Sequence, residues 1–342
     1  MNSPGVKARK NARLEDIARQ AGVSISTVSR ALNDSPAVKR RTKQEIWRIA
    51  REYDYDFRSH MPNGPVGAEA TIAVIVPAPQ ARETRVADPF FLELLAGIAE
   101  AARERKADLV ISHVFPRSAE DLEFAMTTSR ATGMIFIGQS SLHEAFNSLS
   151  DRDDRFVVWG ADFADAAYCS VGSDNVTGGR RATSHLLRLG RQRVLFVGDT
   201  EGPEMGQRFR GYRLAHEQAG ASIDDALSIP AQFDVHSGES ATRSAIESGL
   251  EFDAIFAASD LIAIGAIRAL TKSGRSVPED VSVVGYDNIA AARLVTPRLT
   301  TIDQDANLAG RMLVSKLIDT QGQQAVSERL ETSLLIRESC GG

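Results

Sequence analysis

Residues 22–33 (GVSISTVSRALN) hold side chains that could hydrogen-bond to the edges of DNA bases. At helical spacing, one face of this segment carries small or hydrogen-bonding groups, namely Ile25, Ser26, Ser29 and Arg30. Arginine can donate two hydrogen bonds to one guanine, and a helix fits into the major groove. The pattern therefore predicts a helix that reads DNA sequence.

Two neighbouring helices would hold this one in place. The segment before it has apolar residues at helical spacing, at Leu14, Ile17, Ala18 and Ala21. Gly22 would end that helix in the left-handed conformation, and Ser24 would cap the next helix. Val28 and Leu32 would bury the second helix against the first. A third helix over 42–53 would add the apolar side chains of Ile46, Ile49, Ala50 and Tyr53.

Three short helices within about sixty residues are typical of a helix-turn-helix DNA-binding domain. A helical hairpin inside a larger core would show the same spacing, but charge favours DNA. Residues 1–60 carry 13 Lys or Arg and 7 Asp or Glu, whereas the other 282 residues carry 27 and 38. A basic head on an acidic body indicates that the head meets the phosphates.

Composition limits the possible classes of protein further. The 342 residues, 43% hydrophobic and 25% charged, suit two or three globular domains. The chain has no run of 18 apolar residues and no secretory signal, and its two cysteines, Cys169 and Cys340, lie in unlike contexts. We therefore expect a cytoplasmic protein without a membrane partner. Motifs for nucleotide-binding loops, serine hydrolases and zinc sites are absent. We therefore expect a protein without enzymatic activity that binds no cofactor and no metal ion.

The sequence divides into a head, a linker and a body. Residues 58–70 contain two prolines and two glycines, a density that predicts a linker or hinge between a head over 1–57 and a body over 71–340. In the body, short apolar runs alternate with helical stretches, which predicts parallel sheets with helices on both faces. The expected runs are 71–76, 107–114, 133–137, 156–159, 193–197, 254–257 and 281–285. This length favours two subdomains, with a ligand bound between them at the carboxyl ends of the strands.

Polar and aromatic residues follow several of these runs. They include Asp88, Phe90, Trp159, Arg208, Ser259, Asp260 and Asp287. Carboxylates and an arginine can bind the hydroxyls of a polyol, and aromatic rings can cover the apolar side of a sugar. Alternatively, Asp260 and Asp287 cap the helices that follow them, and Phe90 or Phe91 belongs to the core.

Taken together, these motifs resemble the LacI/GalR family of transcription regulators from about residue 13 to 339. Residues 22–33 are close to the helix-turn-helix signature of the family, and six further motifs follow in the family's order, at 88–92, 174–180, 208–212, 281–287, 299–302 and 337–339. The resemblance implies an all-α head and an α/β body similar to periplasmic binding proteins. It also implies crossovers near 170–175, 300–305 and 320–325, and a homodimer on a pseudo-palindromic operator.

The resemblance also implies roles for single residues. Ile25 and Ser26 match positions that read bases, and Arg30 matches an arginine that contacts guanine. Positions that meet phosphate correspond to Ser24, Thr27, Ser29, Asn33 and Thr42. Arg208 and Asp287 match the main effector-binding residues, and the same cleft would be lined by Phe90, Trp159, Phe233 and Ser259.

The hinge departs from the family pattern. Family members have a hinge helix whose leucine enters the minor groove at the operator centre, but here Gly64 lies near that position, between Pro62 and Pro65. We expect operator affinity to change little when the two central base pairs are exchanged. Changes in the half-sites should cost about 1–3 kcal/mol each. Binding titrations on operators with permuted centres test this, since a strong central preference would show that Met61, Val66 or another hinge residue enters the groove.

Three functions fit these observations to different degrees. The first is a sequence-specific DNA-binding regulator, expected to be a repressor controlled by a sugar or a related small molecule. The second is a sugar-binding protein without a regulatory role, which the DNA-binding head argues against. The third is a carbohydrate-active enzyme on the same scaffold, which would turn over a sugar.

Overall fold

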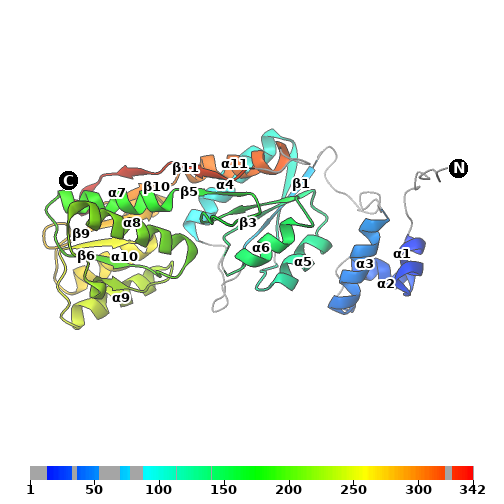
Figure 1. The fold of residues 1–342 in the computed structure, drawn as a ribbon, viewed down its shortest axis with the longest axis horizontal. Coiled ribbons are helices and arrows are strands. Elements are labelled where there is room, and N and C mark those ends of the chain that lie inside the picture. Colours follow the sequence, from blue (N-terminus) through cyan, green and yellow to red (C-terminus); the bar gives the residue numbers. More distant parts are fainter. Residues whose placement is uncertain are drawn as a thin grey trace.

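The computed structural model describes residues 14–32, 37–53, 70–77, 88–112, 114–139, 141–319 and 326–341. They form a small helical head and two α/β halves (Figure 1). Within these ranges, no helix is long and apolar enough to cross a bilayer.

The head consists of α1 (Leu14–Ala21), α2 (Ile25–Leu32) and α3 (Arg40–Glu52). Its core contains the expected apolar side chains, among them Ile17, Val28, Ile46 and Ile49, each at most 1% exposed. Gly22 has a φ of +65°, as expected of the residue that turns the chain from α1 into α2. The apolar spacing read from the sequence thus describes the packing of this head.

The first half of the body is built on a six-stranded parallel sheet, in the order β11-β5-β4-β3-β1-β2. Its strands are β1 (Ala70–Ile75), β2 (Ala107–Ile111), β3 (Gly133–Ile137), β4 (Phe156–Trp159), β5 (Ser170–Ser173) and β11 (Glu328–Leu330). Its helices are α4 (Pro89–Glu104), α5 (Ala119–Thr128), α6 (His143–Ser150) and α11 (Ala306–Asp319).

Alternation along β1 shows why helices cover both faces of this sheet. Ile72 and Val74 pack with α4 and α11, whereas Ala73 and Ile75 pack with α5 and α6 on the opposite face. Successive side chains of a strand point to opposite faces, so a continuous apolar run needs a cover on each side.

The second half repeats this plan. Its sheet has the order β12-β10-β9-β8-β6-β7, parallel except for the antiparallel pair of β10 and β12. Its strands are β6 (Val194–Val197), β7 (Ser228–Ile229), β8 (Ala254–Ala257), β9 (Ser282–Asp287), β10 (Thr300–Asp303) and β12 (Ser333–Leu335). Its helices are α7 (Asn175–Arg188), α8 (Pro203–Ala219), α9 (Val235–Glu247) and α10 (Asp260–Lys272), with short 3-10 turns η2 (Asp225–Leu227), η3 (Ala290–Arg293) and η4 (Glu338–Cys340). Helices α7 and α8 cover one face, and α9 and α10 cover the other (Figure 1).

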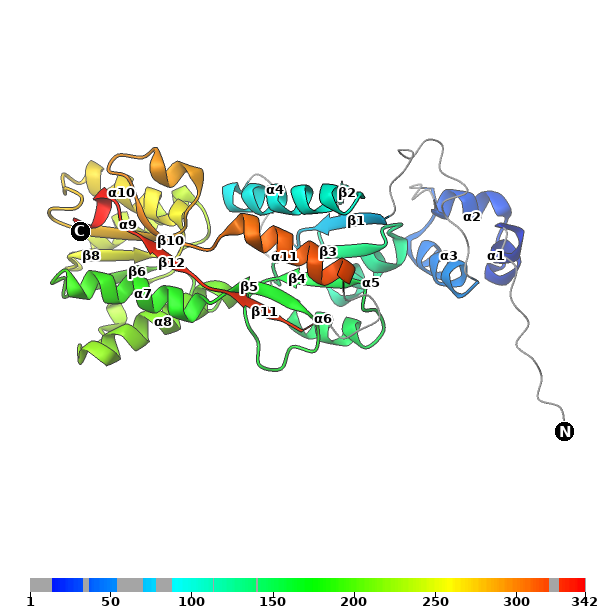
Figure 2. The ribbon, with the colours of Figure 1, turned by 90° about the horizontal axis from the view of Figure 1, so that it is seen from above.

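The chain passes between the halves three times. It crosses from β5 to α7, from β10 to α11 and from β11 to β12 (Figure 2). The first two crossovers lie where we expected them, near 170–175 and 300–305. The third expectation, 320–325, was wrong, because β11 still belongs to the first sheet and the chain crosses only at residues 331–332.

Candidate nucleic-acid interface and ligand-binding cluster

Helix α2 begins at a serine cap. The Thr27 backbone N–H donates to Ser24 Oγ at 3.1 Å, as the sequence predicted. The Ser24 hydroxyl also lies 2.8 Å from both Ser26 Oγ and Thr27 Oγ1. The three hydroxyls therefore form one hydrogen-bonded group at the start of the helix.

The surface of α2 is suited to contact with DNA. Ser24, Ser26 and Arg30 are exposed, and Ile25 is 47% exposed although it is a large apolar residue. Partly buried positions are occupied by Thr27, Ser29 and Thr42, and Asn33 lies outside the described residues. An exposed apolar side chain beside hydroxyls and a guanidinium can meet both the thymine methyl groups and the polar edges of bases.

The body holds a buried arginine at the carboxyl ends of the second sheet. Arg208 on α8 is 3% exposed, and its Nε donates to Asn175 Oδ1 at 2.9 Å. Its Nη1 donates to the Ala258 carbonyl at 2.5 Å, and its Cζ lies 3.7 Å from the centroid of the Tyr286 ring. These contacts hold the guanidinium in a single orientation.

Asp287 lies beside this arginine at the end of β9. Its Oδ1 is 3.5 Å from Arg208 Nη1 and accepts a hydrogen bond from Gln304 Nε2 at 2.6 Å. Gln304 Oε1 in turn accepts a 2.6 Å bond from the Ser173 hydroxyl. Ser173, Asn175, Arg208, Asp287 and Gln304, all buried, are called the interdomain cluster below, because two of the three crossovers contribute to it.

The backbone at this point is unusual. Asp287 has a φ of +115° and Asn288 a φ of +59°, a region that favours glycine. Arg337 Nη2 donates to Asn288 Oδ1 at 2.6 Å and so supports the turn. Such conformations persist where the surroundings determine them, and they concentrate at binding sites.

Neither aspartate caps the following helix, so that alternative was wrong. The cap of α10 is Ser259, whose hydroxyl accepts from the Ile262 N–H at 3.2 Å. The Asp260 carboxylate accepts from the Thr301 hydroxyl at 2.5 Å and from the Ile289 N–H at 2.9 Å. Asp260 thus braces the turn after Asp287.

Burial raises the pKa of Asp287 to about 7, although the nearby Arg208 guanidinium lowers it. The pKa of Asp260 is raised well above its usual value, first by burial and then by the charge of Asp287. Because the folded state binds the proton of Asp287 more tightly than the unfolded state does, stability should fall as the pH rises between about 4 and 7.

Asp287→Asn should therefore flatten the decline in the free energy of unfolding between pH 4 and 7. Urea titrations at four pH values in this range measure it. The part of the decline caused by Asp260 should remain. An unchanged slope would mean that Asp287 keeps an ordinary pKa in the folded protein.

The predicted aromatic residues separate into two groups. Phe90 and Trp159 are 7% and 5% exposed, their ring centroids lie 5.7 Å apart, and both belong to the core of the first half. Phe91 is half-buried. Phe233 is 41% exposed, and its ring centroid lies 5.8 Å from Arg208 Cζ. Arg208 therefore brings together Asp287 and Phe233, whereas Phe90 and Trp159 pair in the other half.

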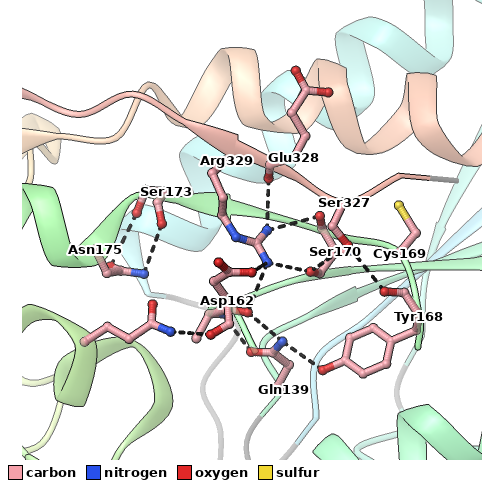
Figure 3. A network of polar contacts seen from close by, with 12 residues as sticks. Gln139, Asp162, Tyr168, Cys169, Ser170, Ser173, Asn175, Ser327, Glu328 and Arg329 are labelled. Carbon is pink, nitrogen blue, oxygen red and sulfur yellow. Dashed lines mark hydrogen bonds and ion pairs between the residues drawn. The ribbon is translucent and has the colours of Figure 1, made fainter. Parts of the chain in front are cut away.

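The loop after β4 faces α8 from the first half. The Gln139 side chain bonds the Ala161 N–H and carbonyl at 2.7 and 2.9 Å, and Arg329 Nη2 donates to Asp162 Oδ1 at 2.8 Å (Figure 3). From the second half, Gln207 Nε2 donates to the Asp162 carbonyl at 2.5 Å. A rigid loop on one half is thus bonded to the helix that carries Arg208.

Several residues of this region carry no signal that the sequence motifs identified. Asn175, Gln304, Gln139 and Arg329 were not among the candidates. Asn175 lies inside the resembling segment at 174–180, which could have revealed it. The other three lie at the end of β3, in the second crossover and on β11, and no motif that we had identified includes them.

Known protein families match both the helical head and the α/β body. A model of bacterial regulatory proteins of the lacI family matches residues 13–56, and a periplasmic binding protein-like domain matches 183–340. The chain is 30% identical over 343 residues to the HTH-type transcriptional regulator CelR of Thermobifida fusca, covering 98% of this chain and 100% of that protein. It is 29% identical over 344 residues to the HTH-type transcriptional repressor CytR of Escherichia coli strain K12, covering 98% of each.

Solved structures show the same similarity. A complex of the regulator CelR with cellobiose matches with a TM-score of 0.70 and 31% identity, covering 96% of this chain and 100% of that one. A lac repressor dimer bound to operator has the same fold, with a TM-score of 0.69 and 24% identity over 97% of this chain and 99% of that one.

Proposed function

Since the chain belongs to the lacI family of bacterial regulatory proteins, we propose that it is a repressor whose binding to operator DNA responds to a sugar or a related small molecule. The observation that carries the proposal is the buried contact of Arg208 with Asp287, placed at the carboxyl ends of the second sheet in a chain with a helix-turn-helix head. The curated relatives are regulators rather than enzymes.

In the head, α2 would lie in the major groove. Ile25, Ser26 and Arg30 would contact bases, and phosphates would be met by Ser24, Thr27, Ser29 and Thr42, together with Asn33. We assign the head to 1–57, the hinge to 58–70 and the effector-binding body to 71–340. This division places every proposed DNA contact in the basic part of the chain.

In the body, the interdomain cluster would bind the effector. Carboxylate and amide groups can pair with the hydroxyls of a sugar, and Phe233, 41% exposed beside Arg208, could cover its apolar face. Phe90 and Trp159, packed in the core of the first half, and Ser259, which caps α10, would support the effector site from its two sides. CelR, which is similar over nearly the whole chain, has been solved in complex with cellobiose.

Exposed apolar residues favour a homodimer. Leu294, next to η3, is 82% exposed, and Val110 and Ile111 on the edge strand β2 are about half exposed, at 50% and 49%. The start of η3 contacts α4 of the other half, since the Ala290 N–H donates to Glu93 Oε1 at 2.9 Å. Both halves could therefore contribute to one interface.

Leu294→Asp should weaken this dimer because it would bury a charge in the interface. Sedimentation velocity at micromolar concentration should show a shift from dimer to monomer. Leu189→Asp, at a 38% exposed position at the end of α7, provides the matched control. Equal dimer fractions in wild type and Leu294→Asp would place the interface elsewhere.

The proposed function is tested by operator release. Operator sequences selected from random DNA would be titrated with the full chain by fluorescence anisotropy, with and without cellobiose, ribose, glucose or adenosine. We expect specific binding to a two-fold symmetric site and at least one compound that changes its affinity. Turnover of a sugar, or equal binding to all DNA, would contradict the proposal.

A further inference from the structure

Acidic groups outnumber basic ones around the interdomain cluster. Asp287 lies 3.5 Å from Arg208 Nη1, and Glu204 lies one helical turn before Arg208 on α8. From the first half, Asp88 at the N-terminus of α4 acts electrostatically on Asp287. With the buried Asp260 there are four carboxyl groups around the turn at Asp287, against the two guanidinium groups of Arg208 and Arg337, the second of which donates to Asn288 Oδ1 at 2.6 Å.

Both guanidinium groups already donate to acceptors within the protein, Arg337 to the Leu299 carbonyl and to Asn288 Oδ1. Arg208 donates to Asn175, to the Ala258 carbonyl and to Asp287. Asp88 accepts the N–H groups of Phe90 and Phe91 through one oxygen, Oδ1. The Glu204 carboxyl accepts backbone hydrogen bonds from Glu204 itself and from Ala161, in the loop after β4. A carboxylate has about four lone-pair sites, so both side chains keep acceptor capacity for a ligand donor.

Burial is the main reason why the pKa values of Asp88 and Glu204 are raised. A further negative charge beside these groups would meet ionised carboxylates or force them to take up protons, and both oppose binding. A ligand rich in hydroxyl or amine donors would instead pair with the carboxyl oxygens.

We propose that the interdomain cluster selects effectors that lack an anionic group, namely neutral or amine-bearing sugars and nucleosides, and that Glu204 and Asp88 reject uronates and phosphorylated sugars. The inference rests on the proposed function and narrows the class of its effector. It assigns specificity to two residues that make no ion pair with Arg208 at salt-bridge distance in the described part of the chain.

The test compares neutral compounds with their anionic counterparts on the full chain. The pairs are glucose with glucuronate and glucose 6-phosphate, galactose with galacturonate, ribose with ribose 5-phosphate, and adenosine with its monophosphate. Thermal shift identifies the binders, and calorimetry gives the dissociation constants. We expect each neutral binder to bind at least about thirtyfold more tightly than its anionic counterpart.

Glu204→Gln and Asp88→Asn should each reduce this ratio by about tenfold, because each removes one repelling charge and keeps the shape. Asparagine caps a helix as well as aspartate does, so α4 should keep its start. Glu217→Gln, at an exposed position on the same helix as Glu204, is the control and should leave the ratio unchanged.

The outcomes separate the two proposals. Equal or tighter binding of uronates or phosphates by the wild type would overturn the charge selection and leave a sugar-responsive regulator in place. The charge selection would also be overturned if Glu204→Gln and Asp88→Asn both kept the full ratio of neutral to anionic affinity. If no compound of either charge bound, the sugar-responsive function itself would be contradicted.

Discussion

Arg208→Ala is expected to abolish the response to the effector. The substitution removes a buried donor that is held by Asn175 and the Ala258 carbonyl and leaves Asp287 without its cation. Losing one member of a buried, hydrogen-bonded charge pair costs about 2 kcal/mol of binding free energy or more, which is roughly a thirtyfold loss of effector affinity. Calorimetry with an effector found by the panel above measures it.

Two further variants separate binding from folding. Arg208→Ala should also lower the free energy of unfolding, by about 1–3 kcal/mol for each buried acceptor that loses its donor, namely Asn175 Oδ1 and the Ala258 carbonyl. Asp287→Asn should lose effector affinity but gain stability at pH 8, because burial disfavours the charge of Asp287. Arg213→Ala, an exposed arginine on α8, should change neither quantity. Near-normal effector affinity in both cluster variants would place the binding site elsewhere.

Arg30→Ala should reduce specific operator binding and affect binding to random DNA much less. Arg30 is an exposed arginine on the helix that carries the Ser24 cap, where a bidentate contact with guanine is worth about 1–3 kcal/mol of discrimination. Fluorescence anisotropy at fixed salt, on the selected operator and on random duplex, measures the two affinities.

Arg48→Ala on α3 provides the control for a lost positive charge. Arg48 is about half exposed, at 52%, and pairs with Glu45 on its own helix. It should change both affinities slightly and to the same extent. If Arg30→Ala behaved in the same way, Arg30 would contact only phosphate.

Local patterns were sufficient to predict the head and the main strands. β3, β4 and β8 begin and end where the apolar runs predicted, because each is a fully buried strand that a polar residue precedes, namely Thr132, Arg155 and Asp253. The short strands β5, β7, β11 and β12 were not predicted as strands from their own residues. They have two to four residues each and lack the continuous apolar run that marks β4 and β8; β5, for example, is Ser-Val-Gly-Ser. Their pairing with distant strands determines them.

The candidate site shows the same limit. Arg208 and Asp287 could be identified because each follows a strand in a recognisable motif. Gln304 could not, since its importance comes from reaching both Ser173 and Asp287, which are 131 and 17 residues away in the chain. A residue that links two distant segments by hydrogen bonds gains this role from the tertiary structure. A single sequence does not show which segments come together.

The three crossovers have a consequence for how the protein is made. The first half needs α11 to cover its sheet and β11 to complete its edge, and both follow β6–β10 of the second half in the chain, while β12 of the second half follows them. Leu313, Val314 and Leu317 of α11 are at most 4% exposed against that sheet. A ribosome must therefore synthesise nearly the whole chain before either half of the body can close, whereas the head can fold as soon as it emerges. Nonsense mutations after residue 300 should thus leave a folded DNA-binding head on a body that proteases can degrade.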